Sequence, residues 1–415
     1  MYIQRSIHEH ILKHLGRKEY TIITGPRQCG KTTLLRAIYN DIKKLGHEVT
    51  FLTFEDRDIL SAVNRHPEEI FFFAPRPDHV GQANPSLNNI RYIFIDEVQY
   101  ADDPSNFLKY LFDTYGHHLK IVATGSSAFY IDRKFKDSLS GRKRVFELKT
   151  LSFDEWLLFN NMHDLAEELK TIRKQKGYVS ARFRELLGLL NEYLIFGGYP
   201  AVVLERDKQE KIVLLKEIKN AFLKRDIDES GVSDADKFYN LLVLLASQTA
   251  NLVNRNELAN TIGVDNKTIE KYLYVLQKCF HIDLVKPFHS NIRKELIRMP
   301  KVYFKDPGMR NVALNRFFDL NMRDDTGALI ENYVFNRLSH LYDRDIIRFW
   351  RTADKKEIDF IVSTSFNEGL AYEVKMTCKQ GHSISERTFS LAYSNYTLET
   401  ISYHPDPMCV WILSL

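Results

Sequence analysis

Residues near the start of the chain have the types and spacing that bind phosphate and magnesium. Gly25 is followed, after four residues, by Gly30, Lys31 and Thr32. Glycines let backbone N–H groups turn toward phosphate oxygens, a lysine reaches the β- and γ-phosphates, and a threonine hydroxyl is a ligand of Mg²⁺. The sequence therefore predicts a P-loop for ATP and Mg²⁺, formed by Gly25, Pro26, Arg27, Gln28, Cys29, Gly30, Lys31, Thr32 and Thr33.

A second segment with chemical potential is RYIFIDEVQ, residues 91–99, in which an apolar run ends in two carboxylates. Behind a P-loop, this pattern is typical of a Walker B motif. Asp96 would hold the Mg²⁺ shell, and Glu97 would orient or activate the attacking water. On its own, an apolar run that ends in acidic residues is a common end of a strand.

Two further positions could act on the γ-phosphate. Ser126 or Thr124, in KIVATGSS at 120–127, could sense it from a neighbouring strand tip, and a plain strand exit is the alternative interpretation. Arg142 could serve as an arginine finger for a neighbouring subunit, with Arg144 as its rival and a solvated arginine as the alternative. A finger in trans requires head-to-tail contacts, which form a ring if the rotation closes.

The elements that must position these residues alternate along the first part of the chain. Strand-like runs are separated by helical or irregular segments and lie at 21–24, 47–56, 91–99, 120–127 and 145–151. This alternation predicts a parallel sheet between two layers of helices.

A second group of charged residues lies near the end of the chain. An amphipathic helix pattern is followed by three strand-like runs, at 327–342 and then at 345–351, 357–363 and 370–376. Glu373 and Lys375 share one face of the last run, because side chains alternate along a strand. Asp359 and Glu373 could bind Mg²⁺, which activates water for attack on a phosphate. Lys375 could orient the nucleophile, and Glu331 could complete the metal shell. Charged residues on two ordinary strands are the alternative.

The middle of the chain is helical and locally basic. Two helical segments around Gly263, followed by a possible wing, predict a winged helix-turn-helix. Residues 267–310 contain ten basic and four acidic residues, whereas the whole chain has a net charge of only +4. This excess favours contact with the DNA backbone rather than base reading, and a domain used only for subunit contacts is the alternative. The candidate DNA-binding residues are Lys267, Lys271, Arg293, Lys294 and Arg298.

Several motifs occur in an order that resembles one family. GPRQCGKTTL, IFIDEVQ, ATGSS, LSGR, LSFDEW and FGGYP are similar to motifs of prokaryotic AAA-type (AAA+) ATPases with a C-terminal domain long catalogued as of unknown function. The match covers nearly the whole chain. The resemblance implies an ATPase core, a helical lid, a ring assembly and a C-terminal part with a restriction-endonuclease-like, PD-(D/E)xK-type fold. It implies no settled biological role.

Together these patterns predict an α/β protein with four parts. A P-loop parallel-sheet ATPase core with a helical lid is followed by a winged helix and a small α/β nuclease-like domain. The expected ranges are 1–151 for the core, 152–235 for the lid, 236–315 for the winged helix-turn-helix and 316–415 for the nuclease-like domain.

Composition and apolar runs limit the cellular setting. The longest apolar runs, such as 241–246, are too short to span a bilayer, and the N-terminus lacks the apolar core of a signal peptide. The four cysteines are far apart and lack metal-ligand spacing, so we expect unpaired thiols in a reducing cytoplasm. They are Cys29, Cys279, Cys378 and Cys409.

The expected function is that of an ATP-hydrolysing, DNA-binding AAA-type protein, forming a homo-oligomeric ring. Its nucleotide state would be coupled to the nuclease-like domain, and its DNA could be branched. One alternative is a nucleotide-dependent switch or scaffold for a protein partner, with a catalytically inert nuclease-like domain. Another is a nuclease effector that is restrained until the ATP state changes.

Overall fold

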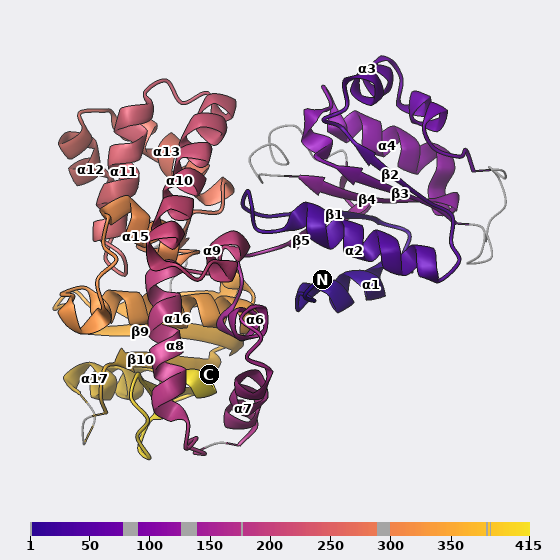
Figure 1. Ribbon diagram of the computed structural model, residues 1–415. Helices are drawn as coiled ribbons and strands as arrows, with labels where there is room; N and C mark the ends of the chain where they lie inside the picture. The colour runs from indigo at the N-terminus through magenta and orange to yellow at the C-terminus, as the bar shows by residue number, and fades with distance from the viewer. Residues whose placement is uncertain are drawn as a thin grey trace. The chain divides into compact units, whose positions relative to one another are not determined.

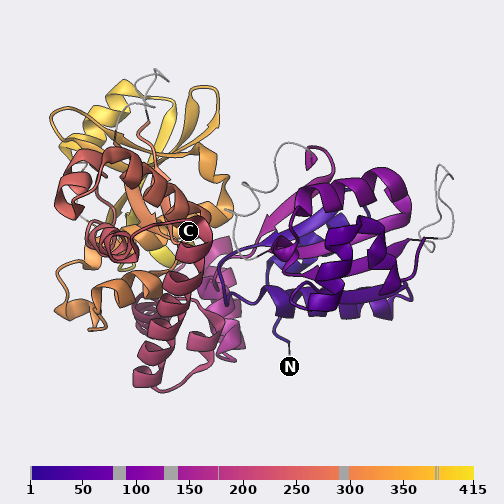
Figure 2. The ribbon, with the colours of Figure 1, turned by 90° about the horizontal axis from the view of Figure 1, so that it is seen from above.

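The computed structural model describes residues 2–77, 90–125, 139–175, 177–288, 299–378, 381 and 383–415, without the side chains of 225, 226, 228 and 229. The chain forms two compact units. The first contains residues 1–149 and 278–280, and the second contains residues 150–277 and 281–415. In Figure 2 the first unit runs from indigo to purple and the second from magenta to yellow.

The first unit is built on a five-stranded sheet in the order β2-β3-β4-β1-β5, in which every neighbouring pair is parallel. The strands are β1 (Tyr20–Thr24), β2 (Val49–Thr53), β3 (Arg91–Asp96), β4 (Leu119–Gly125) and β5 (Lys143–Glu147). The main helices are α1 (Ile7–Leu15), α2 (Lys31–Lys44), α3 (Arg57–Arg65) and α4 (Pro104–Tyr115).

Helices cover both faces of this sheet, α1 and α2 on one and α3 and α4 on the other (Figure 1). Adjacent residues of β1 show why. Ile23 packs in the cluster formed with α1 and α2, whereas Ile22 packs in the cluster formed with α3 and α4. Because successive side chains of a strand point to opposite faces, a continuous apolar strand requires cover on both sides. The predicted parallel-sheet α/β fold is confirmed.

The second unit contains a mixed five-stranded sheet in the order β12-β11-β10-β9-β8. Its strands are β8 (Ile347–Arg351), β9 (Glu357–Ser365), β10 (Glu368–Lys375), β11 (Tyr396–Ser402) and β12 (Val410–Trp411). Strands β8, β9 and β10 form an antiparallel run, and β11 and β12 then add in parallel. Helix α16 (Thr326–Leu341) precedes β8, and α17 (Ile384–Ala392) connects β10 to β11. A C-terminal α/β sheet domain, as predicted, is therefore present.

Apart from one hairpin and short 3-10 turns, the other described elements of the second unit are α-helices. They are α6 (Phe153–Phe159), α7 (His163–Lys174), α8 (Phe183–Phe196), α9 (Pro200–Leu204), α10 (Lys208–Ser230), α11 (Ala235–Ser247), α12 (Arg255–Ile262), α13 (Asn266–Lys278) and α15 (Pro307–Leu314). The hairpin pairs β6 (Ile282–Val285) with β7 (Lys301–Phe304) in antiparallel fashion.

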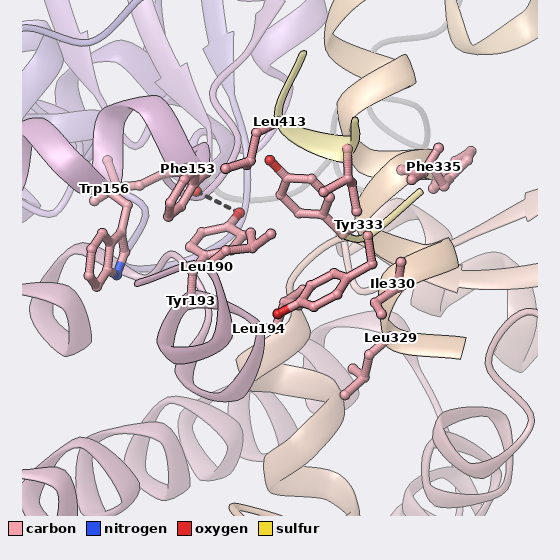
Figure 3. Close-up of a cluster of buried hydrophobic side chains, with 14 of the residues drawn as sticks. Phe153, Trp156, Leu190, Tyr193, Leu194, Leu329, Ile330, Tyr333, Phe335 and Leu413 are labelled. Atoms are coloured by element: carbon pink, nitrogen blue, oxygen red, sulfur yellow. Dashed lines mark hydrogen bonds between the residues drawn. The ribbon is translucent and has the colours of Figure 1, made fainter. Parts of the chain in front are cut away.

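One hydrophobic core joins the early helices of this unit to its C-terminal sheet. Figure 3 shows side chains from α6 and α8, such as Trp156 and Tyr193, in one cluster with Ile330 and Tyr333 of α16 and with Leu413 near the end of the chain. The helices predicted as a lid thus share their core with the predicted nuclease-like domain. The division of the chain into four domains stays a prediction.

The FGGYP motif forms a close backbone junction after α8. The Gly198 N–H donates to Asp306 Oδ2 at 2.8 Å, and Asp306 Oδ1 accepts from the Met309 N–H at the start of α15. A Cβ on Gly198 would lie 2.2 Å from the carbonyl oxygen of Leu151. The glycine is therefore required by the close approach of two backbone segments.

We expect Gly198→Ala to destabilise the second unit by about 1–3 kcal/mol, because the Leu151 backbone would have to move. Urea unfolding followed by tryptophan fluorescence measures this unit alone, since the three tryptophans of the chain are Trp156, Trp350 and Trp411. Gly188→Ala on α8 is the matched control, because its Cβ would meet nothing within 4 Å. Equal stability of the two variants would contradict the expectation.

The structure corrects the expectation of four unpaired thiols. Cys378 and Cys409 form a disulfide, whereas Cys29 and Cys279 are buried thiols outside it. Cys378 follows β10 and Cys409 precedes β12, and these strands flank β11 in the sheet. Tertiary folding thus joins two residues separated by 31 positions, so cysteine spacing gives no argument for a reducing compartment. In the described residues, every helix is too short or too polar to cross a membrane.

Candidate functional site

The predicted P-loop connects the end of β1 to the start of α2. Three of its residues have positive φ: Gly25 at 152°, Gln28 at 60° and Gly30 at 98°. A Cβ on Gly25 would lie 2.1 Å from the Leu148 carbonyl oxygen, so this position accepts only glycine. The loop leads directly into α2, whose free N–H groups and dipole favour an anion. The backbone therefore suits a phosphate group.

The Lys31 side chain lies against this loop. Its Nζ donates to the carbonyl oxygens of Gly25 at 3.1 Å and Pro26 at 2.8 Å. The Cys29 thiol is fully buried in the hydrophobic core, so only the backbone of Cys29 can face a phosphate.

Residues from three elements meet at the carboxyl edge of the sheet. The Thr32 hydroxyl donates to Asp96 Oδ2 at 2.8 Å, and the Thr124 hydroxyl donates to the other oxygen of Asp96. The Glu97 N–H donates to Thr124 Oγ1 at 3.0 Å. A hydroxyl and a carboxylate side by side are oxygen ligands of the kind that Mg²⁺ prefers, so these residues fit the predicted cation.

Sequence reasoning assigned no role to Gln99, which donates from its amide to Glu97 Oε2. Its position could have suggested this contact, because Gln99 lies two residues after Glu97, on the short helical turn Val98–Tyr100. Ser126, the other predicted sensor, lies outside the described residues.

Arg142 lies at the opposite edge of the sheet from the P-loop. Because β5 is parallel to β1 and Lys143 pairs with Tyr20, Arg142 precedes the amino ends of both strands. Five residues of strand at about 3.3 Å each separate this edge from the P-loop. Arg142 instead pairs with Asp113 of α4, at 2.6 Å from Nε to Oδ1. A finger role, for Arg142 or for Arg144 on β5, stays a prediction and would require another subunit.

The C-terminal residues singled out in the sequence lie together in the second unit. The pairing of Tyr372 with Phe360 brings the next residues, Glu373 and Asp359, opposite each other on β10 and β9. Asp359 Oδ2 accepts the Val374 N–H at 2.8 Å, and Lys375 donates to Glu373 Oε1.

Lys301, from the basic segment predicted to contact DNA, lies among the C-terminal carboxylates. We call this group of charged side chains, which includes Glu331, Asp359 and Glu373, the carboxylate cluster. Lys301 Nζ is 2.9 Å from Glu331 Oε1, 2.5 Å from Glu357 Oε1 and 3.7 Å from Asp359 Oδ1. Its side chain is only 2% exposed. Tyr303, two residues along the same strand, donates its hydroxyl to Glu331 Oε1 at 2.6 Å. The sequence could have indicated this, because Lys301 and Tyr303 are two residues apart in a short apolar strand and therefore share one face.

The basic excess of residues 267–310 is therefore smaller on the surface than in the sequence. Besides Lys301, Arg310 is buried in an ion pair with Asp325, at 2.7 Å, and Lys305 lies 3.7 Å from Asp283. These side chains stabilise the interior and are not available to a phosphate backbone.

The carboxyl groups of this cluster have raised pKa values, because they are buried and close to one another. Burial raises the pKa of the Glu331 carboxyl to about 7, and the nearby Asp359 carboxylate adds to the rise. Burial raises the pKa of Glu373 to about 8, again with a contribution from Asp359. Burial also raises the pKa of Asp359, although Lys301 acts in the opposite direction.

One oxygen of the cluster is buried without a hydrogen-bond partner among the described residues. It is Glu373 Oε2. An orphaned carboxylate oxygen beside a second carboxylate, in a cluster that favours proton uptake, fits the coordination of a divalent cation.

The predicted DNA-binding residues are placed only in part. Lys267 and Lys271 are exposed on α13, whereas Arg293, Lys294 and Arg298 lie outside the described residues. Helix α12 ends at Gly263, whose φ of 72° gives the left-handed cap typical of a tight helix-turn-helix connection. The order of α11, α12, α13, β6 and β7 is that of a winged helix, which stays a prediction.

The fold and the loop at residues 25–32 define a P-loop α/β protein. Residues 17–157 match the family model described as AAA domain. Residues 326–403 match a domain of unknown function (DUF4143), and residues 187–320 match another (DUF8612). The chain therefore contains an AAA domain and a C-terminal DUF4143 domain, as its motifs predicted.

Relatives in archaea and bacteria extend the similarity over nearly the whole chain. An uncharacterised protein of Methanocaldococcus jannaschii is 26% identical over 396 residues, 93% of this chain and 82% of that protein. An uncharacterised protein of Haemophilus influenzae is 26% identical over 353 residues, 82% of this chain and 78% of that protein. A solved structure, the ADP form of Aeropyrum pernix ORC2, is 13% identical and covers 74% of this chain and 90% of that chain. Its TM-score of 0.36 is too low to carry an argument.

Proposed function

We propose that this protein binds ATP with Mg²⁺ at residues 25–33 and hydrolyses it, and that it binds DNA and couples its nucleotide state to the C-terminal domain. The observation that carries the proposal is the convergence of Thr32, Asp96, Thr124 and Glu97 beside Lys31. Comparing ATP hydrolysis with and without linear and branched DNA tests it. Stimulation by DNA supports the coupling, and an unchanged rate favours a switch for a protein partner.

Each residue has a defined part in this proposal. Lys31, which now donates to two loop carbonyls, would turn its ammonium to the β- and γ-phosphate oxygens. Thr32 and Asp96 would hold Mg²⁺, which neutralises charge on the phosphates when bound. Glu97 would orient the attacking water, with its backbone tied to Thr124 and its carboxylate held by Gln99.

Contacts within the first unit give the nucleotide site a path to the end of that unit. Arg5 donates to the Cys29 carbonyl of the loop at 3.0 Å and to the Lys149 carbonyl at 2.8 Å. The Leu148 N–H donates to the Thr24 carbonyl at 2.7 Å. A shift of the loop on nucleotide binding would therefore move Arg5 and, through it, the backbone at Lys149, where the first unit ends.

The proposal includes head-to-tail assembly into a ring. Arg142 precedes β5 at the edge of the sheet away from the P-loop of its own chain. Its guanidinium could therefore reach a γ-phosphate only if that nucleotide is bound to a neighbouring subunit. Its pairing with exposed Asp113 would then have to open on assembly.

For DNA binding, we expect Lys267→Glu combined with Lys271→Glu to weaken the affinity for duplex DNA. The slope of log affinity against log salt should fall by about one for each phosphate that the protein no longer neutralises. Fluorescence anisotropy with the full chain at several salt concentrations measures both quantities. Lys43→Glu combined with Lys44→Glu is the control, because it makes the same charge change at two exposed positions of α2. Unchanged affinity and slope in the double variant would remove α13 from the proposal.

For the C-terminal domain, the orphaned Glu373 oxygen and the neighbouring Asp359 support a Mg²⁺ site used for DNA cleavage, with Lys375 as orienting cation. One observation favours the inert alternative: the Lys301 ammonium already lies among three carboxylates.

Incubating linear and branched DNA with Mg²⁺ or Mn²⁺ separates these two functions. We expect a nuclease to lose most of its cutting in Lys375→Ala. An absence of cutting on every substrate would favour the inert alternative, and equal cutting by both proteins would indicate a contaminant.

A further inference from the structure

Lys301 belongs to two parts of the second unit at once. Its backbone lies on β7, paired with Val285 of β6, and it bridges to Leu252 in the connection between α11 and α12. Its side chain lies in the carboxylate cluster of α16 and β9. The β6–β7 hairpin follows α13, the helix proposed to contact DNA. A single side chain thus connects the segment proposed for DNA to the segment proposed for the cation.

Among the described residues, the cluster has more negative than positive groups. Its carboxylates are Glu331, Glu357, Asp359, Glu373 and Glu386, and its basic groups are Lys301, Lys375 and Arg351. With every group ionised, two negative charges are in excess, which matches one divalent cation. Lys301 contacts Glu331, Glu357 and Asp359, and among the described carboxylates of the cluster the buried oxygen without a partner is that of Glu373. The Lys301 ammonium therefore occupies the side of the cluster where Asp359 would otherwise serve a metal.

We propose that Lys301 is an internal counter-cation that competes with a divalent cation for the carboxylates, so that cation binding and the seating of the β6–β7 hairpin oppose each other. This inference rests on the cation site proposed above. Two cations in one buried site repel, and Asp359 is shared between them. By linkage, a partner that displaces the hairpin, such as DNA bound at α13, raises the affinity for the cation by the same factor by which the cation raises the affinity for that partner. The cluster would then bind its cation only when the hairpin has moved and Lys301 has left the carboxylates.

Mn²⁺ binding to the nucleotide-free full chain, measured by calorimetry, tests the competition. Lys301→Met should bind Mn²⁺ about tenfold or more tightly than the wild type, within the range of coupling between linked sites. Lys305→Met is the matched control, because Lys305 follows the same strand but pairs with Asp283. Adding Glu373→Gln to Lys301→Met should abolish the gain, which assigns the cation to this cluster.

Three results would overturn the inference, and they are distinguishable. Equal affinities of wild type and Lys301→Met remove the competition and leave the cation site standing. Weaker binding in Lys301→Met makes Lys301 a residue that positions the ligands. An absence of Mn²⁺ binding in every variant removes the cation site together with the competition, and leaves the ATP and DNA proposals untouched.

A second measurement needs no variant, so it stands even if Lys301→Met fails to fold. Amide hydrogen exchange of the wild type should become faster at β6 and β7 when Mn²⁺ is added, because the hairpin loses its Lys301 contacts. Amides of α4 in the other unit, which carries none of the proposed cation ligands, serve as the reference. Slower or unchanged exchange at the hairpin would contradict the proposal.

Discussion

Lys31→Ala is expected to lower the rate of ATP hydrolysis by at least about 100-fold, the loss typical of removing one preorganised group that stabilises charge in a transition state. In the structure, Lys31 is the ammonium at the mouth of the loop, only 6% exposed and held by two carbonyls. Alanine cannot replace its charge at the β- and γ-phosphates. Phosphate release from the purified full chain under saturating ATP is the measurement.

Glu97→Gln separates hydrolysis from binding at the same site. Glutamine keeps the size of the side chain but cannot act on the attacking water as a carboxylate does, so we expect ATP to stay bound and turnover to fall. Retention of labelled ATP after rapid gel filtration measures the trapped nucleotide. Lys44→Ala, on the exposed end of α2, should behave as the wild type. Unchanged turnover in both Lys31→Ala and Glu97→Gln would show that the site is assigned to the wrong residues.

Without divalent cations, the second unit should lose stability as the pH rises from about 6.5 to 8. Glu331 and Glu373, with pKa values raised to about 7 and about 8, keep protons in the folded state that the unfolded chain has already released. Because the folded state binds more protons in this window, the free energy of unfolding falls by up to about 1.4 kcal/mol per pH unit for each proton kept. Tryptophan fluorescence in urea at each pH measures this unit.

One histidine opposes this slope without reversing it. Burial lowers the pKa of His281 to about 3, so its contribution to stability rises with pH until the unfolded histidine, with a pKa of about 6.5, is almost fully neutral near pH 7.5. At pH 6.5 this amounts to about half a proton, which is less than the protons that the two carboxyls together keep. Glu373→Gln should flatten the slope by up to one proton, whereas Glu368→Gln, exposed at the other end of β10, should leave it unchanged. Mn²⁺ should also flatten it, since a bound cation replaces the protons. A slope that is flat or rises with pH in the wild type would contradict the raised pKa values of the cluster.

The nucleotide site was predictable because its residues belong to two short motifs, each of which can be recognised locally. Residues 25–33 span the loop after β1 and the start of α2, and Asp96 ends β3, which lies two places from β1 in the sheet. Because the strands are parallel, their carboxyl ends meet at one edge, so residue type and strand alternation suffice to bring the two motifs together. The same local logic placed Glu373 and Lys375 on one face of β10. Thr124 was open in the sequence between two roles, and the Thr124–Asp96 hydrogen bond shows where its hydroxyl lies.

Burial and long-range pairing, by contrast, were decided by the tertiary structure. Composition counted Lys301 and Arg310 as surface charge, yet both lie in the interior, because α16, β9 and the segment at 323–325 surround them with carboxylates. Cysteine spacing suggested four thiols, yet the sheet brings Cys378 to Cys409. The sequence by itself determined the phosphate-binding loop, the acidic strand end and the three-strand run, since each depends on residue type and period. Only the tertiary structure decided which charged groups meet. The energy of a charged group depends on its burial and on its ion-pair partners, and residues distant in sequence determine both.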